Sequence, residues 1–206
     1  IPPWAIADHI NFDARPVFYP GTYSSGEDQG GGPWGVHPPY NNYFDVIWLA
    51  WLLVRRAGGD PALLRETVNG LTVYERLQKA FGGPRVDERG IVYTTDEERA
   101  VGFIFCDTIH MTGHLLMATL LRRRAAGHLR DLAMDLGREA EAGRYAVEFA
   151  RPVPHLPDRF AHLSDWLRAA TGLSGQPDVF GTLYALYTHS LPEGAHAAAR
   201  AAAIAA

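Results

Sequence analysis

The chain has 206 residues, of which 47% are hydrophobic and 20% charged, and its formal net charge at pH 7 is −4. This apolar content excludes a disordered chain, and the slight acidity is unlike the basic surface of a nucleic-acid-binding protein. We expect no membrane span, because the longest apolar run covers only residues 46–54, whereas a helix needs about 20 residues to cross a bilayer.

The length is typical of a single domain. The one cysteine, Cys106, cannot form a disulfide within the chain. The sequence begins without methionine and ends in an alanine-rich stretch that lacks a helix stop signal. We therefore interpret it as a fragment of a longer protein, and its cellular compartment stays open.

Residues 1–39 are predicted to form one long loop. Glycine and proline recur through this segment, for example at 30–33 and 38–39, at a density that breaks helix and strand patterns. The segment also carries aromatic side chains, in which a disordered linker is poor. We expect an ordered loop that lies against another part of the protein.

Apolar residues at helical spacing dominate the rest of the chain and predict three helical hairpins, over 40–82, 107–151 and 177–206. The first helices of these hairpins begin at nearly equal intervals, which is typical of a structural repeat. The connections within each hairpin are predicted to be short, as antiparallel neighbours require. The connections between hairpins, 83–107 and 152–176, are long, and loops of this kind are usually functional.

Capping signals indicate where these helices begin. Asn42 is the expected cap of the first helix, and Asp60 followed by Pro61 is expected to begin its partner. Asp107 or Thr108 is expected to begin the second hairpin, and the string Pro-Asp at 177–178 the third.

Hairpins packed side by side would have parallel first helices, whose N-termini share one rim with the long loops. Asp45, Asp107 and Asp178 lie at these predicted N-termini. A carboxylate at a helix N-terminus is also favoured simply as a cap or by the helix dipole. A capping explanation therefore competes with a catalytic one at each of the three positions.

Two segments on this rim are richer in functional groups than capping requires. The segment 26–42 combines acids, amides, an imidazole and aromatic rings, and the segment 166–182 combines an aromatic ring, an arginine, an amide and an acid. Aromatic faces stack on sugar rings, while carboxylate, amide and guanidinium groups bond to sugar hydroxyls. A hydrogen-bonded surface loop explains the same composition equally well. The candidate side chains are Glu27, Asp28, Trp34, His37, Tyr40, Asn42, Arg168, Gln176 and Asp178.

No metal or cofactor is predicted. His110 and His114 are four residues apart, but the glutamate of the helical zinc motif is missing and no third ligand accompanies them. The glycines at 30–32 are not followed by the lysine and hydroxyl residue of a phosphate-binding loop. Cys106 adjoins an acid that would raise the pKa of its thiol, so we expect a small buried residue rather than a nucleophile.

Four strings of the sequence are similar to those of a known superfamily: PGTYSSG at 20–26, PPYNN at 38–42, GFIFCDT at 102–108 and GQPDVFGT at 175–182. With the hairpin pattern, they resemble the six-hairpin α/α glycosidases, in particular a bacterial group related to glucoamylase-like and glycogen-debranching enzymes. The resemblance implies an all-α fold, a partial α/α toroid that supplies three of the six hairpins and carries its long loops on one rim. The rest of the toroid is expected from sequence outside this chain.

The resemblance also implies hydrolysis of a carbohydrate substrate, with inversion as the commoner outcome. One carboxyl group protonates the leaving oxygen and a second activates water. Asp107 is the expected general acid, because the apolar residues before it would raise its pKa towards a working range. Asp178 is the expected second carboxylate, as base or substrate ligand, and Glu27 and Asp28 are reserve candidates. The expected sugar contacts are Trp34, His37, Tyr40, Asn42, Arg168 and Gln176.

Two other classes of function remain open. A non-catalytic carbohydrate-binding or scaffold protein would keep the aromatic residues of the bowl and tolerate the loss of Asp107. A sugar isomerase or lyase of the same architecture usually relies on paired histidines in the bowl, whereas only His37 lies near the expected rim.

Overall fold

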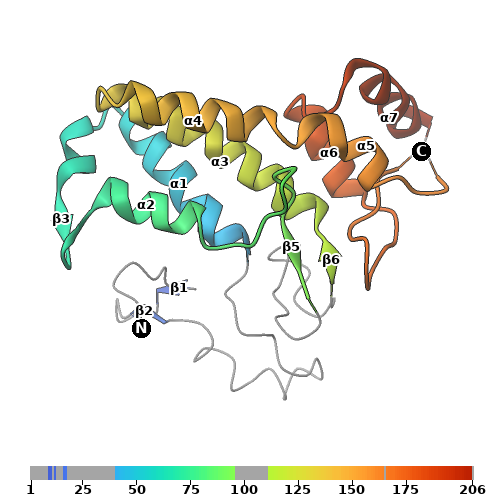
Figure 1. Ribbon diagram of the computed structural model, residues 1–206, viewed down its shortest axis with the longest axis horizontal. Helices are drawn as coiled ribbons and strands as arrows, with labels where there is room; N and C mark the ends of the chain where they lie inside the picture. The colour runs from blue at the N-terminus through green and yellow to red at the C-terminus, as the bar shows by residue number, and fades with distance from the viewer. Residues whose placement is uncertain are drawn as a thin grey trace.

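A computed structural model describes residues 9–10, 12, 16–17, 40–95, 111–164 and 166–205 of the chain. The described part is mostly helical, in agreement with the expected all-α class (Figure 1). Its helices form an open array, and the only strands described are two-residue pairs, the first of which joins β1 (His9–Ile10) to β2 (Pro16–Val17).

The long helix α3 (Leu116–Asp135) is the centre of the array. Four helices pack on it: α1 (Tyr40–Arg55), α2 (Val73–Phe81), α4 (Glu139–Ala150) and α6 (Val179–Tyr187). Buried side chains lie on most sides of α3, as is typical of a helix enclosed by neighbours. The fully buried leucines of α3 include Leu116, Leu120, Leu129 and Leu132.

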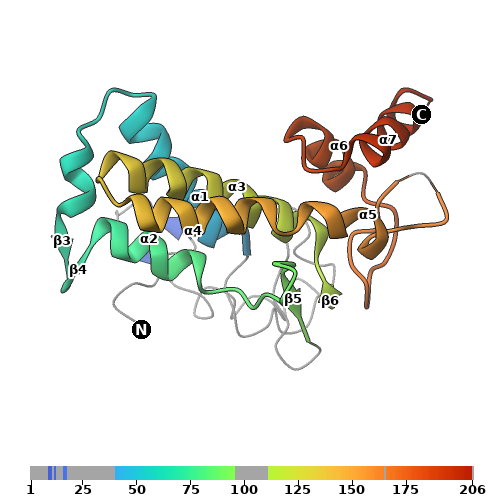
Figure 2. The same cartoon turned by 45° about the horizontal axis from the view of Figure 1, so that its top comes forward.

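The helices α1 and α3 run in the same direction, as Figures 1 and 2 both show. Their contacts advance together along the two helices. The guanidinium of Arg124 lies 4.2 Å from the ring centre of Trp48. About two turns further along α1 and three turns further along α3, Arg55 pairs with Asp135 at 2.8 Å. The N-termini of α1 and α3 therefore lie at the same end of the array.

The helix α6 follows the same direction along α3. A Cβ atom on Gly181, in its first turn, would meet the side chain of Leu116, the first residue of α3. Further along both helices, the hydroxyl of Tyr184 accepts a 2.9 Å hydrogen bond from Arg124. The starts of α1, α3 and α6 thus share one end, which we call the N-terminal end of the array.

The other helices return in the opposite direction or extend the array. Figures 1 and 2 show that α2 (Val73–Phe81) and α4 run antiparallel to α1 and α3. The turn from α3 to α4 is short, as expected, and passes through Gly137 with a positive φ of 72°. The last helix, α7 (Glu193–Ala205), packs on α6.

The connection from α1 to α2 differs from the expected short turn. Asp60 does cap a helical segment, but this segment is the 3-10 helix Pro61–Arg65 and it ends after five residues. A hairpin of β3 (Thr67–Val68) and β4 (Leu71–Thr72) follows it.

Two local signals explain why the chain leaves the helical conformation there. Asn69 and Gly70 both have positive φ, 49° and 80°, which is the geometry of a tight hairpin turn. The side chains of Thr72 and Glu75 then form a reciprocal capping box, which starts α2. The expected single helix from Asp60 to residue 82 is therefore wrong.

The start of the second hairpin also needs correction, because α3 begins at Leu116 and not at Asp107 or Thr108. The residues just before it form β6 (Gly113–His114), which pairs antiparallel with β5 (Tyr93–Thr94). Strand pairing satisfies the backbone groups here, and Gly113 has a φ of 77° that no helix allows. Asp107 itself lies outside the described residues.

The connections before α3 and α6 lie side by side. The backbone N–H of Leu116 donates to the carbonyl of Ala169, and that of Gly172 donates to Thr112 at 2.8 Å. The expected long loop 152–176 contains, before this contact, the 3-10 helix Val153–His155 and the short helix α5 (Leu156–Arg159). Extended backbone thus joins the two helix starts at the N-terminal end.

We expect Gly113→Ala to lower the free energy of unfolding by about 1–3 kcal/mol, because its φ is unfavourable for alanine. An added Cβ would also lie only 2.8 Å from the backbone nitrogen of Gly172. Denaturant unfolding measures the effect.

The matched control is Gly143→Ala within α4, where a Cβ would have open space. This variant is expected to gain about 0.5–1 kcal/mol, because alanine favours the helix. Equal stabilities for the two variants would contradict the close approach at Gly113.

Candidate functional site

The structure brings together three of the predicted site residues at the N-terminal end. Arg168 lies in a β-bridge with Pro177, and the N–H of Ala169 donates to the carbonyl of Gln176 at 2.9 Å. The N–H of Asp178 donates to Leu167 at 2.7 Å. Arg168, Gln176 and Asp178 therefore lie on two adjacent backbone segments at the start of α6.

Asp178 is the N-cap of α6. Its Oδ1 accepts a 2.7 Å hydrogen bond from the N–H of Gly181, so the capping explanation is confirmed at this position. Burial raises the pKa of the carboxyl group above its usual range, and the bond from Gly181 opposes that rise. A raised pKa suits a group that exchanges protons, although capping already occupies one of its oxygens.

The two neighbours of Asp178 differ in how firmly they are held. The Nε of Arg168 donates to the carbonyl of Ala161 at 2.6 Å, which fixes the guanidinium against its own loop. Gln176 is exposed. Of the two, Gln176 is the better placed to contact a ligand from solvent.

Tyr40 and Asn42 lie in the first turn of α1. Tyr40 is only 2% exposed and packs beside Tyr43, so its ring belongs to the core and the expected stacking on a sugar is wrong for this residue. Asn42 is inside the helix rather than its cap, and its side-chain oxygen accepts a 3.1 Å bond from Asn41.

The other predicted residues cannot be placed. Glu27, Asp28, Trp34, His37 and Asp107 lie outside the described residues.

A polar cluster that the sequence did not predict lies beside this site. Nε2 of His114, the residue of β6 nearest to α3, is 3.3 Å from Oδ2 of Asp87 and 3.4 Å from Nη2 of Arg159. Burial and the charge of Arg159 lower the pKa of the imidazole, despite the opposing effect of Asp87. The only sequence signal was the His110/His114 spacing.

Within the described residues, no group of three or more potential metal ligands gathers.

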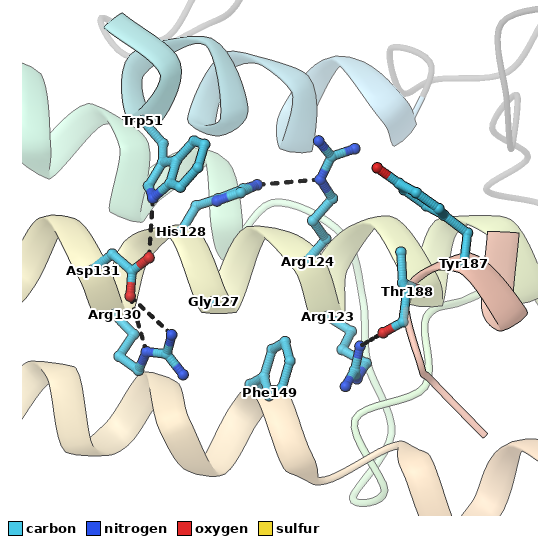
Figure 3. A pocket seen from close by; sticks show the side chains of 10 residues that line it. All are labelled: Trp51, Arg123, Arg124, Gly127, His128, Arg130, Asp131, Phe149, Tyr187 and Thr188. Atoms are coloured by element: carbon cyan, nitrogen blue, oxygen red, sulfur yellow. Dashed lines mark hydrogen bonds and ion pairs between the residues drawn. The ribbon is translucent and has the colours of Figure 1, made fainter. Parts of the chain in front are cut away.

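A separate pocket of about 330 Å³ lies on the surface of α3, between α1, α4 and α6 (Figure 3). Its cationic side chains are engaged in the structure. Nε of Arg124 donates to Nε2 of His128 at 3.2 Å, Nη1 of Arg123 donates to Thr188 at 3.0 Å, and Arg130 pairs with Asp131 at 2.9 Å. The pocket is therefore a junction between helices rather than a group of available cations.

Aromatic rings complete this junction. Phe149 lies between two arginines in Figure 3, with the guanidinium of Arg123 3.9 Å from its ring centre. The ring of Trp51 lies 4.5 Å from that of His128 in a tilted arrangement, and its indole N–H donates to Asp131 at 3.0 Å.

None of the described helices combines the length and apolar character needed to cross a bilayer. No protein-family model, curated protein or solved structure matches the chain.

We expect Asp178→Ala to lower the free energy of unfolding by about 1 kcal/mol, because the N–H of Gly181 loses its acceptor. Asp178→Asn is expected to be nearly neutral, since an asparagine oxygen caps as well as a carboxylate. Thermal unfolding of both variants at pH 7 measures the difference. Equal losses for Ala and Asn would show that the charge, and not the cap, stabilises α6.

The pocket in Figure 3 predicts a pH dependence of stability. Burial, with a contribution from Arg124, lowers the pKa of His128 to about 4. Because the pKa of His128 is lower in the folded than in the unfolded protein, the unfolded protein takes up a proton first as the pH falls. The stability present at pH 7 is therefore lost progressively as the pH falls towards 4. His128→Gln keeps an acceptor for Arg124 but cannot be protonated, so it should lose less stability than the unsubstituted protein over that interval.

Melting temperatures between pH 7 and pH 4 test this expectation. The control is His155→Gln, because His155 lies outside this pocket. The loss of stability that depends on His128 should be the same in this variant as in the unsubstituted protein. A His128→Gln profile parallel to that of the unsubstituted protein would contradict the role of His128.

Proposed function

We propose that the chain is part of a glycoside hydrolase of the α/α-toroid type, with its site at the N-terminal end of the array. The observation that supports this most is the shared direction of α1, α3 and α6. Their starts lie together with the string 175–182, one of the four that resemble the six-hairpin glycosidases. Parallel inner helices with connections gathered at one end are what such a bowl requires.

Exposed apolar side chains on the outer faces of α1 and α6 favour further hairpins beyond this chain. Leu49 on α1 is 60% exposed, and Phe180 and Tyr187 on α6 are 76% and 77% exposed. Helices that are apolar on all sides are usually buried on all sides. In the proposed toroid, neighbouring hairpins would cover these faces.

The proposed chemistry uses two carboxyl groups. We assign the role of general acid to Asp107. This carboxylate is not needed as a cap of α3, because that helix begins at Leu116 and its cap is Leu115. Asp178 is assigned as the second carboxylate, a base or a sugar ligand. Its raised pKa supports this role, and its cap bond to Gly181 fixes the orientation of the group.

The test begins with a screen of aryl glycosides of glucose, mannose, galactose and rhamnose, with the chain in its full-length protein. For the glycoside that is cleaved, we expect Asp107→Asn to lower kcat by a factor of at least about 100, because general-acid catalysis typically contributes this much. KM should change little, since the amide keeps the shape of the acid. Steady-state kinetics measure both.

The matched control is Asp60→Asn, the same change at the cap of the 3-10 helix between α1 and α2. It should leave kcat unchanged. If Asp107→Asn still binds saccharide and its kcat is unchanged, Asp107 is not the general acid, and Glu27 or Asp28 becomes the candidate for that role. Binding without cleavage of any glycoside would instead favour the carbohydrate-binding alternative.

A further inference from the structure

A second cavity, of about 370 Å³, lies between the turn that precedes β5 and the segment around α5. Its lining side chains are all polar: Arg89 from the turn, and His155, Asp158 and Arg159 from the 3-10 helix and α5. We call it the α5 pocket.

The guanidinium groups of the α5 pocket are poorly neutralised. Among the described residues, no ion pair involves Arg159, and its buried Nε has no hydrogen-bond partner. Within the same described part of the chain, Arg89 pairs with the neighbouring Glu88 at 3.7 Å, and their side chains are 45% and 81% exposed. The lining acid, Asp158, is itself exposed. That nitrogen of Arg159 is closed off from solvent, so the other N–H groups of Arg159, which lines the pocket, are the ones that would meet a ligand, and charged acceptors form the strongest hydrogen bonds to guanidinium donors.

A chain of polar contacts orients Arg159 towards this role. Oδ1 of Asp87 accepts from the N–H groups of Arg89 and Ile91 at 3.0 and 2.9 Å, which fixes the turn and its carboxylate. Oδ2 of Asp87 faces Nε2 of His114, and the same nitrogen lies 3.4 Å from Nη2 of Arg159. The turn, β6 and α5 are thus held together beside one guanidinium, that of Arg159, which lines the pocket.

We propose that the α5 pocket binds the oxyanion group of an acidic saccharide, either a carboxylate or a sulfate ester. Binding of the oxyanion stands on the pocket alone, whereas the saccharide that carries it rests on the proposed function. Planar guanidinium groups bind carboxylate and sulfate oxygens with paired N–H donors, and two arginines with a histidine supply such donors here. The pocket also lies beside the start of α3, at the N-terminal end where the hydrolase site is proposed.

The experiment measures binding and not catalysis, so an inactive hydrolase does not affect it. Titration calorimetry with glucuronate, sulfate and neutral glucose is carried out on the full chain. Glucuronate and sulfate should bind in a manner that depends on Arg89, whereas any binding of glucose should be the same in Arg89→Gln as in the unsubstituted chain. Arg89→Gln should weaken glucuronate binding about tenfold, the loss expected for one charged hydrogen bond, while the melting temperature stays unchanged because Arg89 is exposed.

The matched control is Arg144→Gln, which removes the same charge from an exposed position on α4. It should bind glucuronate as the unsubstituted chain does. Equal weakening by Arg89→Gln and Arg144→Gln would overturn the proposal, because it would show a general effect of charge. Glucose binding that Arg89→Gln weakens as much as it weakens glucuronate binding, or no saturable binding of either anion, would also overturn it.

Discussion

Three consecutive buried or half-buried arginines on α3 hold the helices of this protein in place. Successive helical residues point about 100° apart, so Arg122, Arg123 and Arg124 reach different neighbours. Arg122 pairs with an acid of α4, Arg123 donates to carbonyl groups at the end of α6, and Arg124 stacks on a tryptophan of α1. Buried cations are costly unless such contacts are made, so the packing around α3 depends on all three.

This arrangement determines where a ligand site can form. Because α1 and α6 are both aligned with α3, their starts gather at one end, together with the extended segments that carry Gln176 and Asp178. The same extended backbone places His114 beside Asp87 and Arg159. The capping carboxylate and the α5 pocket are therefore neighbours in the fold, although long stretches of sequence separate them.

The sequence predicts the parts of this fold that depend on local signals. The start of α6 followed from Asp178, and the short α3–α4 turn followed from the hairpin pattern. The turn at 69–70 and the capping box at 72–75 are equally local, but the helical pattern around them concealed both. Strand pairing before α3 is different, because His114 pairs with Tyr93 across a long connection that carries no local turn signal.

The site was predictable only where a local rule applied. Asp178 could be recognised as a cap, whereas the burial of Tyr40 depends on the core formed by distant helices. The partners of the arginine run of α3 lie on other helices and cannot be read from sequence spacing. The pairing of Asp87 with His114 likewise depends on β5–β6 register, which no motif in either segment indicates.

The central claim is that carbohydrate binds at the N-terminal end of the array, and a chemical-shift map of the backbone amides tests it directly. Titration with a mixture of short oligosaccharides, followed by amide NMR spectra of the full chain, locates bound sugar without requiring turnover. We expect the shifted amides to gather at 112–116 and 167–181, on the extended segments that precede α3 and α6. Shifts confined to the opposite end, around 135–139 and the end of α1, or no saturable shifts at all, would contradict the claim.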